Sequence, residues 1–125
     1  MTRNIIAILR GVRPYKVFEI TGFLLGCDVT KIEVPLNSPD PSESIAAVVQ
    51  EFGDHAIIGA GTVLTVSDVH RTCDVGGKIV VSPNCDPQLI SAAKSAVLVS
   101  YPGVMTPNEC FTALNLGADG KIFPR

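Results

Sequence analysis

The chain has 125 residues, a formal net charge of −2 and 46% hydrophobic residues. This length suits one globular domain with a real core and is short for two. The slight negative charge leaves no basic surplus for nucleic acid, and neither secretion nor membrane insertion is expected, because Arg10 ends the apolar run at 5–9. The four cysteines form no Cys-x-x-Cys pair, so we expect free thiols in a reducing cytoplasm.

Short apolar runs recur along the chain, separated by stretches with helical periodicity. The runs are rich in Ile and Val and apolar nearly throughout, which is typical of parallel strands that are covered on both faces. Six such runs predict six strands, at 5–9, 32–36, 56–60, 78–81, 97–101 and 120–123.

Five helices are predicted between these strands. Pro14 opens the first, whose apolar face continues to Gly26, and Asp40 with Pro41 opens the second. Capping residues open the other three: Thr65 with Ser67 and Asp68, then Asp86 before Pro87, and Thr106 before Pro107. Strands that alternate with helices in this way predict a β/α repeat with parallel strands.

Two architectures fit this repeat. An open, doubly wound sheet accommodates five or six strands in a chain of this length, whereas a TIM-type (β/α)8 barrel needs two strands more than the six predicted. The periodicity alone does not choose between them. In both architectures the carboxyl ends of the parallel strands meet at one edge, so polar residues at those ends are the candidates for a functional site.

Glu33 and Lys121 lie within predicted strands. Ile32 and Val34 flank Glu33, so alternation directs its carboxylate to the face opposite these two side chains. An ammonium group inside a strand is costly unless it is paired or loses its proton, and a neutral amine beside a carbonyl compound forms an imine. The same two residues also suit a structural ion pair, or a lysine that extends from a strand end into solvent, which are common roles of such residues.

Arg10 ends the first predicted strand, and Thr62 follows the third. Arg10 suits bidentate binding of a carboxylate or phosphate, and equally suits a solvated strand terminus. The stretch 59–62 offers backbone N–H groups to an anion, although a tight strand-to-helix turn uses the same residues and no Walker-type lysine is present. His55 and His70 have no ligand-forming neighbours at suitable spacing, so no metal site is indicated.

Six strings give the chain a resemblance to a known family. They are IIAILRG at 5–11, IEVPLNSP at 32–39, IIGAGTV at 57–63, VVSPN at 80–84, YPG at 101–103 and GKIFP at 120–124. In this order and spacing they resemble the successive strand ends of the 2-keto-3-deoxy-6-phosphogluconate and 2-dehydro-3-deoxy-6-phosphogalactonate aldolases, and the first two strings favour the phosphogalactonate branch. The resemblance implies a TIM-type (β/α)8 barrel, of which residues 1–125 form a single incomplete domain with the first six strands and five helices.

By the same resemblance the chain is a class I aldolase that uses no cofactor. Lys121 would be the Schiff-base lysine and Glu33 the general acid/base, while Arg10 and Thr62 would contact the substrate near its carboxylate. The implied ligands are a phosphorylated keto sugar acid and pyruvate, and the implied assembly is a homo-oligomer, commonly a trimer in the family. In the family, two further β/α units follow the lysine strand and hold the substrate phosphate. These units lie outside these 125 residues.

Two other functions are alternatives to an active aldolase. One is a catalytically impaired β/α domain, and the other is an open-sheet module that binds an anion.

Overall fold

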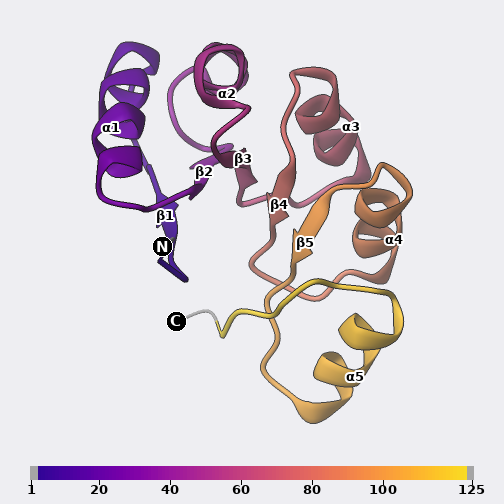
Figure 1. The fold of residues 1–125 in the computed structure, drawn as a ribbon. Coiled ribbons are helices and arrows are strands. Elements are labelled where there is room, and N and C mark those ends of the chain that lie inside the picture. The colour runs from indigo at the N-terminus through magenta and orange to yellow at the C-terminus, as the bar shows by residue number, and fades with distance from the viewer. Residues whose placement is uncertain (1–2, 124–125) are drawn as a thin grey trace.

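The computed structural model describes residues 3–123, in which strands and helices alternate from the first element to the last (Figure 1). The strands are β1 (Ile6–Ile8), β2 (Lys31–Pro35), β3 (Ile57–Gly61), β4 (Ile79–Val81) and β5 (Val99–Tyr101). The helices are α1 (Pro14–Gly26), α2 (Pro41–Phe52), α3 (Val66–Asp74), α4 (Pro87–Ser95) and α5 (Pro107–Asn115). In the described part of the chain, none of them has the length and apolar character that a membrane span requires.

Strand order decides between the two architectures. A doubly wound sheet reverses its strand order at a switch point, whereas the strands of a barrel follow one another around the axis. Here the order is β1-β2-β3-β4-β5, and every neighbouring pair is parallel. The five helices form an arc outside the strands (Figure 1). The fold is therefore an incomplete, unclosed α/β barrel of the TIM type, and the predicted β/α repeat is confirmed.

The described residues contain five strands where the sequence predicts six. Within 120–123, only Ile122 pairs, through an isolated parallel bridge to Gly103. Two backbone hydrogen bonds form this bridge, from Ile122 N–H to the Pro102 carbonyl at 3.0 Å and from Val104 N–H to the Ile122 carbonyl at 2.8 Å. A strand needs pairing over several successive residues, and this segment has it at one residue only.

Most helices begin as predicted, with proline in the first turn of α1, α2, α4 and α5. The side chains of Thr65, Asp86 and Thr106 accept hydrogen bonds from first-turn N–H groups of α3, α4 and α5, and Thr106 forms a capping box with Glu109. Asp40 is the exception, because its backbone is left-handed, with φ of 45°, and its side chain makes no capping hydrogen bond. The predicted start of α2 at Asp40 and Pro41 is confirmed, and it forms without a side-chain cap.

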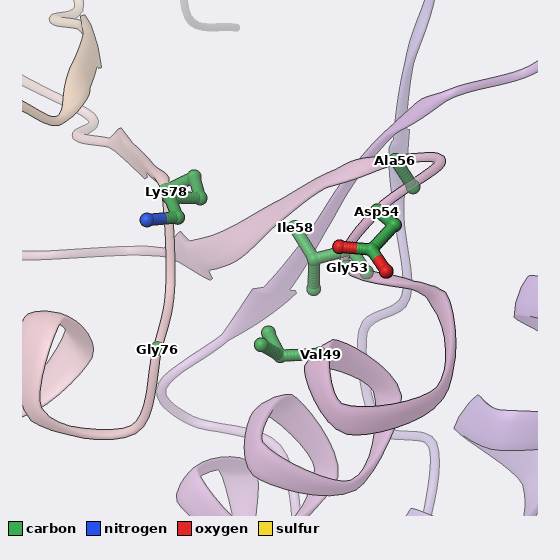
Figure 2. Close-up of a pocket in the computed structure, with 7 residues that line it drawn as sticks. All are labelled: Val49, Gly53, Asp54, Ala56, Ile58, Gly76 and Lys78. Carbon is green, nitrogen blue, oxygen red and sulfur yellow. The ribbon is translucent and has the colours of Figure 1, made fainter.

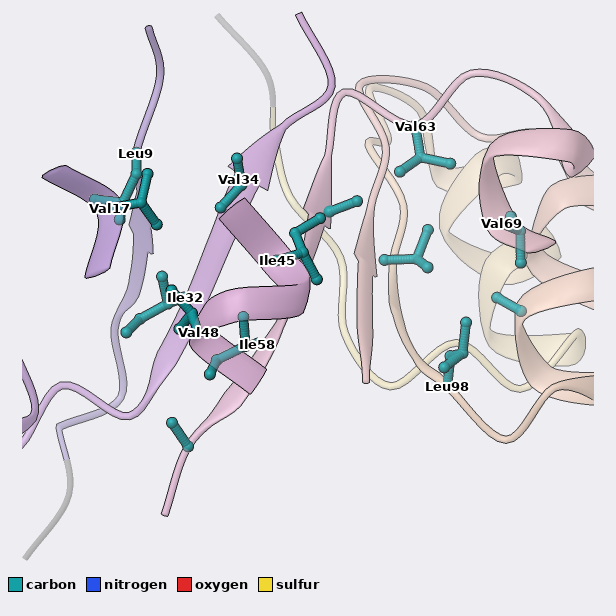
Figure 3. Packing of buried hydrophobic residues seen from close by; sticks show 14 of the residues in the cluster. Leu9, Val17, Ile32, Val34, Ile45, Val48, Ile58, Val63, Val69 and Leu98 are labelled. Carbon is teal, nitrogen blue, oxygen red and sulfur yellow. The ribbon is translucent and has the colours of Figure 1, made fainter. Parts of the chain in front are cut away.

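The hydrophobic core lies between the sheet and the helices (Figure 3). Ile32 and Val34 of β2 and Ile58 and Ala60 of β3 belong to it, and each is at most 1% exposed. Since successive residues of a strand face opposite sides, the residues between them face the inner side of the curved sheet. The core therefore directs Glu33 of β2 toward the inside of the incomplete barrel.

Candidate functional site

Three of the four predicted site residues, Arg10, Glu33 and Thr62, line one pocket at the carboxyl ends of the strands. The pocket has a volume of about 330 Å³. Its other lining residues are Ile8, Val81, Ser82, Pro83 and Ile122. The wall comes from β1 to β4 with the turns that follow them and from the 120–123 segment, because parallel strands bring their carboxyl ends to one edge.

Glu33 is the buried carboxyl group of this pocket. It is 3% exposed, and within the described residues its Oε2 atom has no hydrogen-bond partner. Burial raises the pKa of Glu33 from 4.5 to about 7, and the nearby charge of Arg10 acts in the opposite direction. Glu33 can therefore take up or release a proton near neutral pH, and its unpartnered Oε2 atom packs against Gly61 beside the pocket. These are the properties of a general acid/base.

Gly61 provides the space that this carboxyl group occupies. A Cβ atom at position 61 would overlap both carboxyl oxygens of Glu33. Position 59 also has no room for a side chain, because a Cβ atom there would overlap the backbone of Ile79 in β4. Close packing thus accounts for both glycines of the stretch 59–62, without a bound anion.

Thr62 has a strained backbone at the pocket wall. Its φ is 52°, a left-handed value that is unusual for a β-branched residue. The peptide groups around it are fixed by hydrogen bonds from Leu36 N–H to the Gly61 carbonyl at 3.0 Å and from Val63 N–H to the Val81 carbonyl at 3.1 Å. Strain of this kind persists only where the surroundings hold it, and it is concentrated at functional sites.

Arg10 lies in the turn after β1 with an exposed side chain. Its Nη1 atom donates a hydrogen bond to Asn37 Oδ1 at 3.3 Å. A guanidinium group at the edge of a pocket suits a carboxylate or phosphate, which it binds through two parallel hydrogen bonds. The pocket therefore combines an anion-binding group with a carboxyl group that titrates near neutral pH.

Lys121, the predicted nucleophile, is half-buried. Its neighbour Ile122 lines the pocket, and Lys121 is not among the lining residues. The segment is held by the single bridge at Ile122 and by Asp119, whose carboxylate accepts a hydrogen bond from Ser100 N–H at 2.9 Å. The role of Lys121 stays a prediction. Pro124, the last residue of the GKIFP string, lies outside the described residues.

Sequence reasoning missed Lys31, a lysine on the inner face of the sheet. Lys31 begins β2 two residues before Glu33, so alternation places it on the same side. Its Nζ atom lies 3.5 Å from the Tyr101 hydroxyl and 5.9 Å from the centre of that ring, although β2 and β5 are not neighbours in the sheet. The sheet therefore curls enough for side chains of β2 and β5 to meet across its inner face. The predicted strand started at 32, and extending the alternation by one residue would have found Lys31.

A second, smaller pocket lies at the amino ends of β3 and β4 (Figure 2). Its volume is about 170 Å³, and Val49 and Ile58 form its apolar part. Its two charged residues, Asp54 and Lys78, are both exposed. Among residues 3–123, neither pocket contains a group of three or more His, Cys, Asp and Glu residues that could hold a metal ion.

The chain matches the family model for KDPG and KHG aldolase over residues 1–125. A probable 2-dehydro-3-deoxy-6-phosphogalactonate aldolase of Rhizobium meliloti (strain 1021) is 47% identical over 125 residues, which cover 99% of this chain and 59% of that protein. The 2-dehydro-3-deoxy-6-phosphogalactonate aldolase of Escherichia coli (strain K12) is 40% identical over 121 residues, which cover 96% of this chain and 59% of that protein.

A solved structure agrees with these matches. The structure described as native KDPGal has a TM-score of 0.91 and 37% identity, covering 97% of this chain and 61% of its own. The present chain thus spans about three fifths of the length of the proteins that it matches. From the family model and these relatives we conclude that the chain belongs to the KDPG and KHG aldolase family.

Proposed function

We propose that this chain is a class I aldolase, which cleaves a 2-keto-3-deoxy-6-phospho sugar acid to pyruvate and glyceraldehyde 3-phosphate. The observation that carries the proposal is the buried carboxyl group of Glu33, which has an oxygen without a partner in the described part of the chain and a pKa raised to about 7. The two relatives named above are both 2-dehydro-3-deoxy-6-phosphogalactonate aldolases, which favours the phosphogalactonate acid over the phosphogluconate acid as substrate.

In the proposed reaction, the neutral amine of Lys121 adds to the C2 ketone, a proton is taken up from solvent and water leaves, which produces a protonated imine. The imine accepts the electron pair of the C3–C4 bond as that bond breaks. Glu33, acting through a water molecule, takes the proton of the C4 hydroxyl group. Glyceraldehyde 3-phosphate leaves, the enamine takes up a proton at C3, and hydrolysis of the imine releases pyruvate and Lys121. These steps require no cofactor.

Arg10 and Thr62 are the proposed contacts of the substrate carboxylate. Arg10 supplies the charge, and its position beside Glu33 would place the carboxylate end of the substrate near the acid/base group. The cytoplasm is the proposed compartment, because the four cysteines are free. A homo-oligomer is the proposed assembly, as the family resemblance implies.

Reduction of the imine tests this proposal on the 125-residue chain. The chain is incubated with pyruvate and sodium cyanoborohydride, and mass spectrometry measures the stable adduct. We expect one reduced pyruvyl group for each chain, located in the peptide that contains Lys121. We expect no such adduct in Lys121→Ala.

Lys31→Ala is the matched control, because Lys31 is a lysine on the same inner face as Glu33. The adduct should form in this variant with unchanged yield. The proposal fails if the adduct is located on Lys31. It fails equally if no adduct forms in a chain whose circular dichroism spectrum shows a folded β/α protein.

A catalytically impaired domain is the second candidate. The observation that favours it is the pocket wall, which contains Ile122 and not Lys121. Absence of the adduct in the folded chain would support this candidate.

A further inference from the structure

Ser38 contacts the backbone on both sides of Arg10. Its hydroxyl group accepts a hydrogen bond from Gly11 N–H at 2.9 Å and donates a longer one to the Leu9 carbonyl at 3.5 Å. The Leu9 carbonyl belongs to the peptide group before Arg10, and Gly11 N–H belongs to the peptide group after it. One hydroxyl group therefore constrains both peptide groups that flank Arg10. Ser38 is 6% exposed, so water competes little for these hydrogen bonds.

The residue after Arg10 explains why such a constraint matters. Gly11 is exposed and has a φ of 72°, so the chain turns sharply as it leaves β1. Glycine has the widest backbone freedom of any residue. Without a partner for its N–H group, this turn would let the Arg10 backbone take several orientations.

The residue before Ser38 holds the side chain of Arg10. Asn37 Oδ1 accepts the hydrogen bond from Arg10 Nη1 at 3.3 Å. Two consecutive residues that follow β2 thus contact both the backbone and the guanidinium group of Arg10. The same strand carries Glu33, whose carbonyl accepts a hydrogen bond from Leu9 N–H at 3.0 Å. The position of Arg10 relative to Glu33 is therefore set by β2 and the turn after it.

We propose that Ser38 is a positioning residue for Arg10, and that its hydroxyl group keeps the guanidinium at the pocket edge, where it meets both an anionic ligand and Glu33. Ser38 does not line the pocket, so it acts through Arg10 and not by touching the ligand. The ligand part of this inference rests on the proposed function. The part that concerns Arg10 and Glu33 does not.

The charge on Arg10 affects a measurable quantity, the pKa of Glu33. Arg10 lowers the pKa of Glu33 against the larger, opposite effect of burial. Lys31, also on the inner face, is directed to the Tyr101 hydroxyl. If the guanidinium moves away, the pKa of Glu33 should rise. This effect depends on the position of a charge, so a purely structural role of Ser38 would not produce it.

Carbon-13 NMR of the side-chain carboxyl groups measures the pKa of Glu33 in the folded chain. We expect Arg10→Gln and Ser38→Ala each to raise this pKa, Ser38→Ala by about half a unit. When Ser38→Ala is added to Arg10→Gln, we expect no further rise, because the charge that Ser38 positions is already gone. Ser44→Ala is the matched control, since Ser44 is a fully buried serine whose hydroxyl has no partner among residues 3–123.

An unchanged Glu33 pKa in Ser38→Ala would overturn the inference, as would a rise of equal size in the Arg10→Gln background. Ser38→Thr retains the hydroxyl group and should keep the pKa of the unmodified chain. If Ser38→Ala does not fold, Ser38→Cys replaces it, because a thiol keeps the shape and weakens both hydrogen bonds. We expect a rise in Ser38→Cys too, and no rise there would also overturn the inference.

Trapping of pyruvate by cyanoborohydride tests the ligand part of this inference and shows separately whether the proposed function holds. We expect Ser38→Ala to raise the pyruvate concentration needed for half-maximal trapping by cyanoborohydride about tenfold, with the final adduct yield unchanged. A tenfold rise that persists in the Arg10→Gln background would show that Ser38 acts by another route, which contradicts the inference. If the unmodified folded chain traps no pyruvate, the proposed function fails, and the NMR measurement still decides the role of Ser38.

Discussion

The two ends of the sheet have pockets of different character. At the amino ends of the strands, the charged residues Asp54 and Lys78 are exposed around a small apolar floor (Figure 2). At the carboxyl ends, Glu33 is 3% exposed and has an oxygen without a partner among residues 3–123. Exposed charges are screened by water and are tolerated anywhere on a surface. A buried, unpartnered carboxyl group is costly, so of these two pockets the one at the carboxyl ends is the candidate for chemistry.

The direction of the chain explains the difference. Because every strand is parallel to its neighbour and is followed by a helix, each helix begins near the carboxyl edge of the sheet and ends near the amino edge. Helix N-termini carry partial positive charge, which favours anions. The Glu33 pocket therefore lies at the edge that favours an anionic ligand, and Arg10 adds a full positive charge there.

The largest expected effect concerns proton transfer. Glu33→Gln should slow the exchange of the pyruvate methyl protons with solvent deuterium by about a hundredfold to ten-thousandfold, because an amide cannot act as an acid/base group. Proton NMR of pyruvate measures this exchange. Asp54→Asn, the same change at the amino-end pocket, should leave the rate as it is. Equal rates in the two variants would contradict the distinction between the pockets.

The next effect concerns packing. Gly61→Ala should lower the free energy of unfolding by about 3 kcal/mol, because the new methyl group overlaps the Glu33 carboxyl group. Gly76→Ala at the amino-end pocket should cost about 1 kcal/mol, since it adds a side chain at a φ of 86° and places it 2.9 Å from one methyl group of Val49, without the overlap with two carboxyl oxygens that position 61 has. Urea unfolding measures both. If Glu33→Ala is combined with Gly61→Ala and recovers none of the loss, the overlap is not the cause.

The pH dependence of stability tests the buried carboxyl group directly. The pKa of Glu33 is raised from 4.5 to about 7, so between these pH values the folded chain binds a proton more tightly than the unfolded chain. The contribution of Glu33 to stability is therefore complete below about pH 4.5 and is lost as the pH rises to about 7, by roughly 3 kcal/mol.

Urea unfolding at a series of pH values measures this loss. Glu33→Gln should remove it and be more stable than the unmodified chain at about pH 8. Asp54→Asn should retain it. A loss of the same size in Glu33→Gln would assign the pH dependence to other groups.

The smallest effect is expected at the amino-end pocket. Lys78→Ala should change the free energy of unfolding by less than about 0.5 kcal/mol, because the side chain is exposed and within the described residues forms no salt bridge. The yield of the pyruvate adduct should also stay the same. A loss of adduct in Lys78→Ala would show that both ends of the sheet take part in function.

Local patterns predicted most of the fold. The first helix begins at Pro14 and ends at Gly26, as its proline and its apolar face indicated. Glu33 lies on the inner side of β2, as its apolar neighbours required. Asp40 shows what such patterns do not predict. It precedes α2 as expected, but its backbone is left-handed and its side chain makes no capping hydrogen bond. Backbone conformation in a turn depends on contacts beyond the turn itself.

The sequence by itself determined the order and type of the elements, and the side of β2 on which Glu33 lies, because hydrophobic periodicity and side-chain alternation are properties of neighbouring residues. Only the tertiary structure decided that the Ser38 hydroxyl group accepts a hydrogen bond from Gly11, 27 residues away, and that the predicted sixth strand forms a single bridge. These features depend on how far the sheet curls and on which distant backbone groups meet, and no short stretch of sequence encodes either.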